Sequence, residues 1–144
     1  MDTALTLHEA FAAIPLAAVC CDHTFGKDEA RVIREQLLTR TVYQAMGPYS
    51  FGLMISGLLQ RFREESWQCL IAAAGPLLNQ TQRETAFALA CQVVCADREI
   101  APEEQQFLNA LAAQLDLGDT RAHQILEVCE LLQRDCLAVT LPSL

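Results

Sequence analysis

The sequence predicts an all-α fold, a compact bundle of six or seven helices that forms a single domain over residues 1–144. Apolar residues recur at helical spacing along most of the chain, and no stretch alternates apolar and polar residues as a half-buried strand does. Of the 144 residues, 52% are hydrophobic, which is enough to build a sizeable core. Because no linker-like stretch separates the helical segments, we expect one bundle with short connections.

The helical spacing divides the chain into seven segments. Each has apolar residues on one side and is bounded by residues that cap or break helices. The predicted segments are 7–21, 27–41, 51–63, 64–74, 83–96, 103–115 and 118–134.

Several boundaries are set by capping and breaking residues. Thr6 precedes the first segment and Glu9 follows three residues later, which is the spacing of a capping box. The sequence Met46-Gly47-Pro48 predicts a break, and Gly75-Pro76 stops the fourth segment. Pro102 stands at a first helical position, where its missing N–H is not needed.

The chain contains an internal repeat. Shifting the sequence by 75 residues against itself aligns seven identical residues without a gap, so that residues 6–41 and 81–116 form two related units. The identical pairs are Thr6/Thr81, Glu9/Glu84, Ala13/Ala88, Val19/Val94, Cys20/Cys95, Asp22/Asp97 and Glu29/Glu104. Because each unit has an apolar face that it cannot bury alone, we expect two pseudo-symmetric halves about a two-fold axis.

Each unit has a loop with an acidic residue at either end. Asp22 and Asp97 begin the loops, and Glu29 and Glu104 follow seven residues later in the first turn of the next helix. The spacing resembles the second half of an EF-hand loop, but neither loop has the glycine or the earlier ligands that an EF-hand requires. A helix dipole favours acidic residues in its first turn, so both glutamates also have an explanation without a metal.

The same acids could instead form a cation site. The Thr-x-x-Glu spacing gives Glu9 and Glu84 a structural role as capping-box partners. If the two long helices pack antiparallel, however, the glutamate at the start of each approaches the loop acids of the other copy. Converging carboxylates repel one another unless a cation lies among them, and oxygen-only ligands favour Ca²⁺ or Mg²⁺. The candidate ligands are Glu9, Asp22, Glu29, Glu84, Asp97 and Glu104.

The balance of charge and the hydropathy limit the partners. The chain has 18 Asp and Glu against 10 Lys and Arg, a formal net charge of −8. Nucleic-acid binding needs a basic stripe, so we expect a protein partner and no nucleic acid. No apolar run approaches the ~20 residues of a membrane span. Residues 16–20 imitate a lipidation signal but lack its small residue and its basic flank, so we expect a cytoplasmic protein.

Two stretches of the sequence resemble the TerB-like tellurite resistance proteins, and the motif is also similar to one in membrane-anchored DnaJ-like co-chaperones. The sharper copy runs from Glu84 to Leu115 and contains Glu84–Ala90, Ala96–Ile100 and Pro102-Glu103-Glu104 followed by Phe107-Leu108. The first copy runs from Glu9 to Glu29.

This resemblance implies an all-helical fold of two related halves with no catalytic activity. It further implies a role in metalloid or general stress response, as a cytoplasmic scaffold that can lie next to a membrane through a partner. The family's proposed divalent-metal sites correspond to Glu84, Asp97 and Glu104 and, by the repeat, to Glu9, Asp22 and Glu29.

Two other functions remain open at this point. Paired carboxylates could act as the acid and base of a hydrolase, which would require a cleft and a carboxyl group with a raised pKa. The seven cysteines contain no CxxC pair and suit core positions, but exposed thiols of low pKa could reduce metalloid oxyanions directly.

Overall fold

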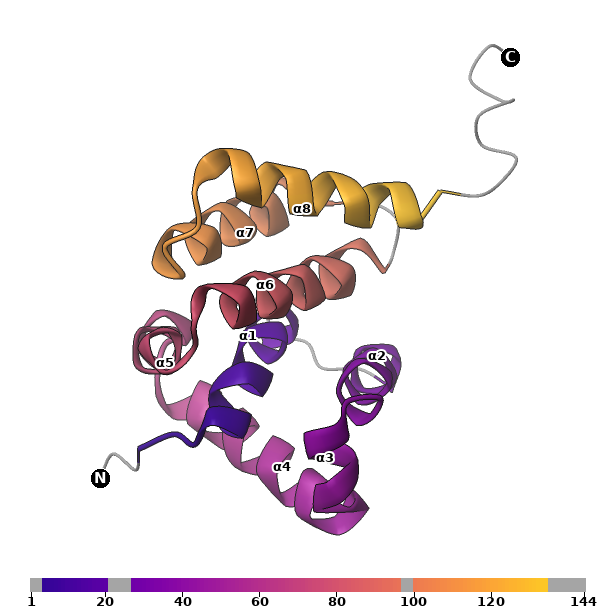
Figure 1. Ribbon diagram of the computed structural model, residues 1–144, viewed down its shortest axis with the longest axis vertical. Coiled ribbons are helices and arrows are strands. Elements are labelled where there is room, and N and C mark those ends of the chain that lie inside the picture. The colour runs from indigo at the N-terminus through magenta and orange to yellow at the C-terminus, as the bar shows by residue number, and fades with distance from the viewer. Residues whose placement is uncertain (1–3, 21–26, 97–99, 135–144) are drawn as a thin grey trace.

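A computed structural model describes residues 4–20, 27–96 and 100–134. This part of the chain is all-α: it holds eight α-helices and one 3₁₀ turn, with no β-strand (Figure 1). The elements are α1 (Leu7–Cys20), α2 (Lys27–Leu38), α3 (Thr41–Met46), α4 (Pro48–Glu64), α5 (Trp67–Ala74), η1 (Gly75–Leu77), α6 (Gln80–Cys95), α7 (Pro102–Gln114) and α8 (Asp119–Leu132).

Helix α1 lies at the centre of the core. It packs most extensively against α6 and also contacts α2, α4 and α5 (Figure 1). Every residue from Ala12 to Val19 is buried, because the segment is apolar on all sides. Five of the residues between Ala10 and Ala18 are alanines, whose small side chains let the surrounding helices approach closely.

Helix α6 separates the two sides of the bundle. One side of α6 rests on α1, and the other carries α8, with α7 packed beside them (Figure 1). Helix α2 is tied to α6 by Gln36, whose Nε2 donates to the Leu89 carbonyl at 3.0 Å and to Gln92 Oε1 at 3.1 Å. The α7–α8 hairpin therefore forms an outer layer on the face of α6 that α1 leaves uncovered.

The described part of the chain has eight helices where six or seven were expected, because α3 (Thr41–Met46) forms in the stretch between the second and third predicted segments. Helix α2 ends at Leu38, where the Thr39 hydroxyl donates to the Gln36 carbonyl at 3.0 Å. Arg40 is extended (φ −95°, ψ 140°) and starts α3 in a new direction. A Thr hydroxyl at a carbonyl of the last turn competes with continuation of the helix.

The break predicted at Met46-Gly47-Pro48 is confirmed. Gly47 has a φ of +84°, a conformation that glycine adopts at no steric cost. Pro48 is the first residue of α4, where the proline ring fits and its missing N–H is not required.

The helix boundaries fit the 75-residue shift in part. Helix α1 ends at Cys20 and α6 at Cys95, while α2 begins at Lys27 and α7 at Pro102. The first turns do not fit, because α6 begins at Gln80, two residues earlier than the shift places it. A two-fold axis between the halves stays a prediction.

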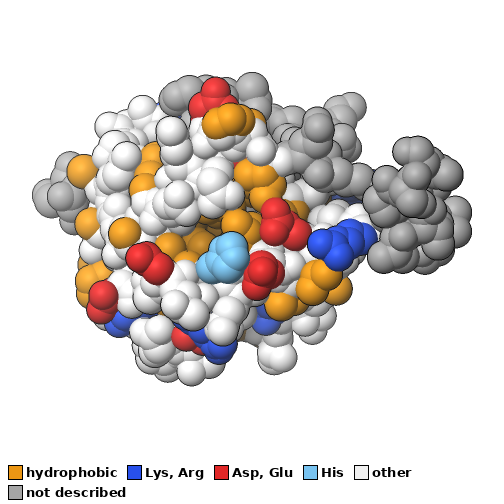
Figure 2. Space-filling view, turned by 90° about the horizontal axis from the view of Figure 1, so that it is seen from above, with side chains coloured by type: hydrophobic (Ala, Val, Ile, Leu, Met, Phe, Trp, Pro, Cys, Tyr) orange, Lys and Arg blue, Asp and Glu red, His pale blue; other side chains and the backbone are white. Residues whose placement is uncertain are grey.

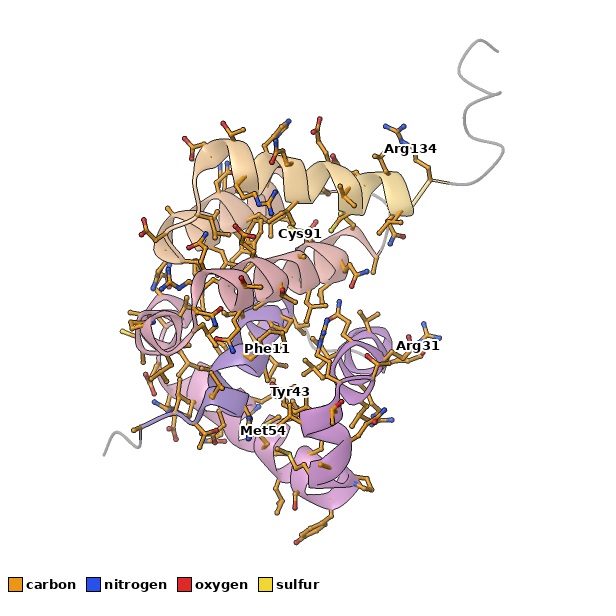
Figure 3. All side chains as sticks on the ribbon, in the orientation of Figure 1. Phe11, Arg31, Tyr43, Met54, Cys91 and Arg134 are labelled. Atoms are coloured by element: carbon orange, nitrogen blue, oxygen red, sulfur yellow. The ribbon has the colours of Figure 1, made fainter. Side chains whose placement is uncertain are left out.

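The buried residues of the described chain are hydrophobic, and no charged side chain is buried among them. Tyr43 brings its hydroxyl from α3 to the first turn of α1, where it donates to the His8 carbonyl at 2.6 Å (Figure 3). Burial raises the pKa of the Tyr43 hydroxyl well above its usual value. No helix within the described ranges is both long and apolar enough to cross a bilayer.

Candidate functional site

Glu9 caps the helix in which it lies. The Thr6 N–H donates to Glu9 Oε1 at 2.8 Å, and the Glu9 N–H donates to Thr6 Oγ1 at 3.1 Å. These reciprocal bonds satisfy two backbone donors at the start of α1. The predicted capping box is confirmed here, so the Glu9 carboxylate already has a structural partner.

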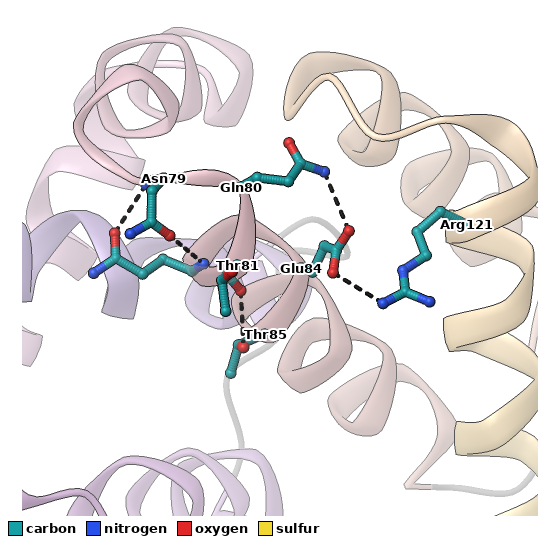
Figure 4. Close-up of polar contacts among 7 residues, drawn as sticks. Asn79, Gln80, Thr81, Glu84, Thr85 and Arg121 are labelled. Carbon is teal, nitrogen blue, oxygen red and sulfur yellow. Dashed lines mark hydrogen bonds and ion pairs between the residues drawn. The ribbon is translucent and has the colours of Figure 1, made fainter.

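Glu84 has a different role, and the capping box predicted for it is wrong. Asn79 caps α6 instead: its Oδ1 accepts from the Gln82 N–H at 2.8 Å, and Gln82 Oε1 accepts from the Asn79 N–H at 2.9 Å (Figure 4). Thr81 lies inside the helix, where its carbonyl accepts from the Thr85 hydroxyl. Because the cap lies upstream, Glu84 is free to contact another helix.

The contact of Glu84 is with α8. Its Oε1 accepts from Arg121 Nη2 at 3.1 Å, and its Oε2 accepts from Gln80 Nε2 at 3.2 Å (Figure 4). Hydrogen bonds from Arg121 and Gln80 lower the pKa of the Glu84 carboxyl below its usual value of 4.5. A general acid needs a raised pKa. Glu84 is therefore poorly suited to the acid role in a hydrolase.

The other predicted ligands are only partly described. Glu104 Oε1 accepts from the Ala101 N–H at 2.9 Å, so it closes the first turn of α7. Glu29 lies in the first turn of α2, but its side chain is outside the description, and Asp22 and Asp97 lie outside the described residues. Within residues 4–20, 27–96 and 100–134, no three His, Cys, Asp or Glu side chains are grouped to hold a metal ion. The six-carboxylate cation site stays a prediction.

Two hollows flank α8, and neither could be predicted from the spacing of residues in the sequence. The larger, which we name the α7–α8 hollow, has a volume of about 650 Å³. Its apolar lining comes from three helices and consists of Phe87, Leu108, Ala112, Ala122 and Leu126. Figure 2 shows acidic side chains and a histidine around an apolar depression on this side of the molecule. A concave apolar floor with polar groups around it is the usual form of a binding site.

The polar residues of this hollow include Asp119 and His123 from α8. Nε2 of His123 lies 3.5 Å from a carboxylate oxygen of Glu127, one turn further along the helix, and both side chains are well exposed. The two form an ion pair when the histidine is protonated.

The α7–α8 hairpin is also the most acidic part of the described chain. Between Pro102 and Leu132 there are six acidic residues and one arginine, Arg121, whereas residues 27–65 hold five acidic and six basic residues. The acids of the hairpin are Glu103, Glu104, Asp116, Asp119, Glu127 and Glu130. Much of the net charge of −8 is therefore concentrated on the outer layer.

The second hollow, which we name the α6–α8 groove, has a volume of about 440 Å³. Apolar residues of both helices line the groove, and so do Cys129, Arg40 and Arg121. The Arg40 guanidinium lies 5.5 Å from the centre of the Phe11 ring, and its buried Nε has no hydrogen-bond partner. A guanidinium over an aromatic face gains a cation–π attraction, which helps to hold Arg40 beside the groove.

The cysteines divide by exposure. Cys69 is exposed and Cys20 is half-buried, whereas Cys91, Cys95 and Cys129 are buried. Cys21 and Cys136 lie outside the described residues. The three buried thiols fit the core role expected for cysteine. Among the described cysteines, Cys69 is the exposed thiol that could reduce a metalloid oxyanion directly.

The comparisons with known proteins give no match: no family model, curated protein or solved structure is significantly similar to this chain.

Proposed function

We propose that this chain is a non-enzymatic helical module, similar to TerB proteins, that binds a protein partner through the acidic surface of α7 and α8 in a metalloid or stress response. The observation that carries the proposal is the α7–α8 hollow, an apolar depression of about 650 Å³ in the most acidic part of the described chain.

The chemistry of the hollow indicates what kind of segment would bind. Its apolar floor suits the hydrophobic side of an amphipathic helix, which binds in a groove through residues spaced three or four apart. The acidic residues around it favour lysine or arginine on the flanks of that helix. The partner segment is thus a basic amphipathic helix, and its association should weaken as the salt concentration rises.

A synthetic peptide tests this proposal directly. The probe is a helix with leucines at positions i, i+3, i+4 and i+7 and lysines on its flanks, and its binding is measured by fluorescence anisotropy at low and high salt. Asp119→Lys, at the hollow, should weaken binding about tenfold, since like charges at an interface cost free energy. The matched control Glu35→Lys makes the same charge change on an exposed position of α2 and should have little effect.

The divalent-cation part of the proposal has its own test. Thermal melts of the wild type with and without Ca²⁺ or Mg²⁺ should show a higher Tm with the bound ion. Asp22→Asn and Asp97→Asn should abolish that shift, while Glu64→Gln on α4 should keep it. If neither ion changes the Tm of the wild type, the cation part of the proposal is wrong and only the protein partner remains proposed.

A further inference from the structure

The interface between α6 and α8 holds a pair of thiols that the proposed function does not use. Cys91 and Cys95 lie one turn apart on α6, and Cys129 faces them from α8. The Cys129 Sγ lies 3.6 Å from the carbonyl oxygen of Ala88, to which it donates. Since Ala88 is three residues before Cys91, Cys129 packs against the same turn of α6 that carries Cys91.

The two thiols differ in access. Cys91 has no exposed surface, and Cys129 is 4% exposed. Cys129 nevertheless lines the α6–α8 groove, a hollow of about 440 Å³ that opens on the surface. Figure 3 places Cys91 between α6 and α8, and Cys91 is not among the residues that line the groove. A small molecule in the groove would therefore meet Cys129 first.

We propose that Cys129 and Cys91 form a modification site, in which a hydroperoxide that enters the α6–α8 groove oxidises the pair to a disulfide between α6 and α8. Cys129 is the attacking residue and Cys91 is the resolving residue. The inference is independent of the proposed partner and of any metal.

The chemistry balances for hydrogen peroxide. The Cys129 sulfur attacks one peroxide oxygen, so that an S–O bond forms, the O–O bond breaks, and the other oxygen leaves as water. The Cys91 sulfur then attacks the sulfenic sulfur of Cys129; the S–S bond forms, the S–O bond breaks, and the oxygen leaves as a second water with the proton of Cys91. Two thiols lose two electrons and two protons, and one peroxide is reduced to two waters.

The hydrogen bonding between the thiols supports this division of roles. A hydrogen bond from Cys91 lowers the pKa of Cys129, which favours the thiolate that reacts with peroxide. The same hydrogen bond, together with burial, raises the pKa of Cys91 and keeps it protonated. The carboxylate of Glu130, next to Cys129 in the chain, opposes ionisation of both thiols.

The test uses the full chain with all its cysteines. Reduced protein is treated with hydrogen peroxide, the excess is removed with catalase, free thiols are alkylated, and the digested protein is examined by mass spectrometry. We expect a linked pair of peptides that contain Cys91 and Cys129, lighter by two hydrogen atoms than the two reduced peptides. Cys69→Ser, which removes the exposed thiol, should give the same link.

Two further samples make the result decisive. Cys91→Ser should leave Cys129 as a sulfenic acid that dimedone traps, and circular dichroism checks that this variant keeps its helices. Protein oxidised in denaturant should lose the preference for the Cys91–Cys129 pair. Full alkylation of Cys129 after peroxide, or a link from Cys129 to Cys95 in place of Cys91, would overturn the proposal.

Discussion

The first turns of α1 and α6 carry the same four-residue pattern, Thr-x-x-Glu, and use it differently. In α1, Thr6 is the cap and Glu9 closes the box. In α6, the cap is Asn79 and the helix begins two residues earlier than the pattern predicts. Glu84 is thereby left for the contact with Arg121 of α8.

This difference shows that a capping pattern competes with its neighbours. Asparagine is a better N-cap than threonine, and Asn79 stands just upstream of Thr81 with Gln82 correctly placed as its partner. In α1 no such competitor precedes Thr6, because the two residues before it are Ala4 and Leu5. A shift of two residues changes a capping glutamate into a contact between two helices.

The largest expected difference between the two copies is in the core. Ile14 and Leu89 correspond in the repeat, but Ile14 has no exposed surface whereas Leu89 is 7% exposed and lines the α6–α8 groove. Ile14→Ala should lower the free energy of unfolding by about 2–5 kcal/mol. Leu89→Ala should cost less, because the site already borders an open hollow. Urea unfolding measures both, and an equal loss would contradict the difference in packing.

The first turn of α1 has a second anchor in Tyr43, whose hydroxyl bonds the His8 carbonyl. Tyr43→Phe should lower the free energy of unfolding by about 1 kcal/mol, because it removes one hydrogen bond while the His8 carbonyl keeps its bond within the helix. The matched control is Tyr49→Phe, at a side chain that is 78% exposed. Thermal or urea unfolding of both variants measures the effect, and a similar stability of the two would show that the Tyr43 bond contributes nothing.

The caps provide the sharpest test of the comparison. Thr6→Ala should cost about 0.5–2 kcal/mol, and so should Asn79→Ala, since each removes the acceptor of an N-cap. Thr81→Ala should be close to neutral, because its side chain is not the cap of α6. Each of the three variants removes a few side-chain atoms, so their free energies of unfolding in urea can be compared directly. A loss at Thr81 as large as the loss at Thr6 would mean that both copies use the same cap.

The smallest effect concerns pH. The lowered pKa of Glu84 means that its ion pair with Arg121 stabilises the fold fully above pH 4.5 and loses that effect as the pH falls through the lowered folded pKa. Glu84→Gln should therefore be slightly less stable than the wild type at pH 7, with the difference shrinking below pH 4.5. Glu130→Gln, at an exposed position of α8, is the control. If the difference in the free energy of unfolding between the wild type and Glu84→Gln does not change with pH, the ion pair is not its cause.

Most of the fold could be predicted from the sequence, because its signals are local. Helical spacing predicts seven of the eight helices of the described chain and misses α3. The residues of the break at Gly47 and of the cap at Thr6 act within a few positions of themselves. The end of α2 was missed because Thr39 bonds back to Gln36, which the apolar pattern does not report.

The candidate sites depend on contacts between distant parts of the chain. Arg121 and Glu84 are 37 residues apart, and no spacing rule connects them. The two hollows arise from how α8 rests on α6 and α7, which periodicity alone does not determine. The structure adds that Val128, Leu131 and Leu132 of α8 are exposed hydrophobic side chains outside its buried face, which helical spacing does not reveal.

The binding of a partner at the acidic hairpin is tested most directly by an NMR titration of the labelled protein with the basic amphipathic peptide. We expect the amide signals that shift to belong to α7 and α8, around Leu108, Ala112, Ala122 and Leu126, and the shifts to diminish as salt is added. Saturating peptide that moves no signals, or moves those of α2 to α4 instead, would contradict the proposed function.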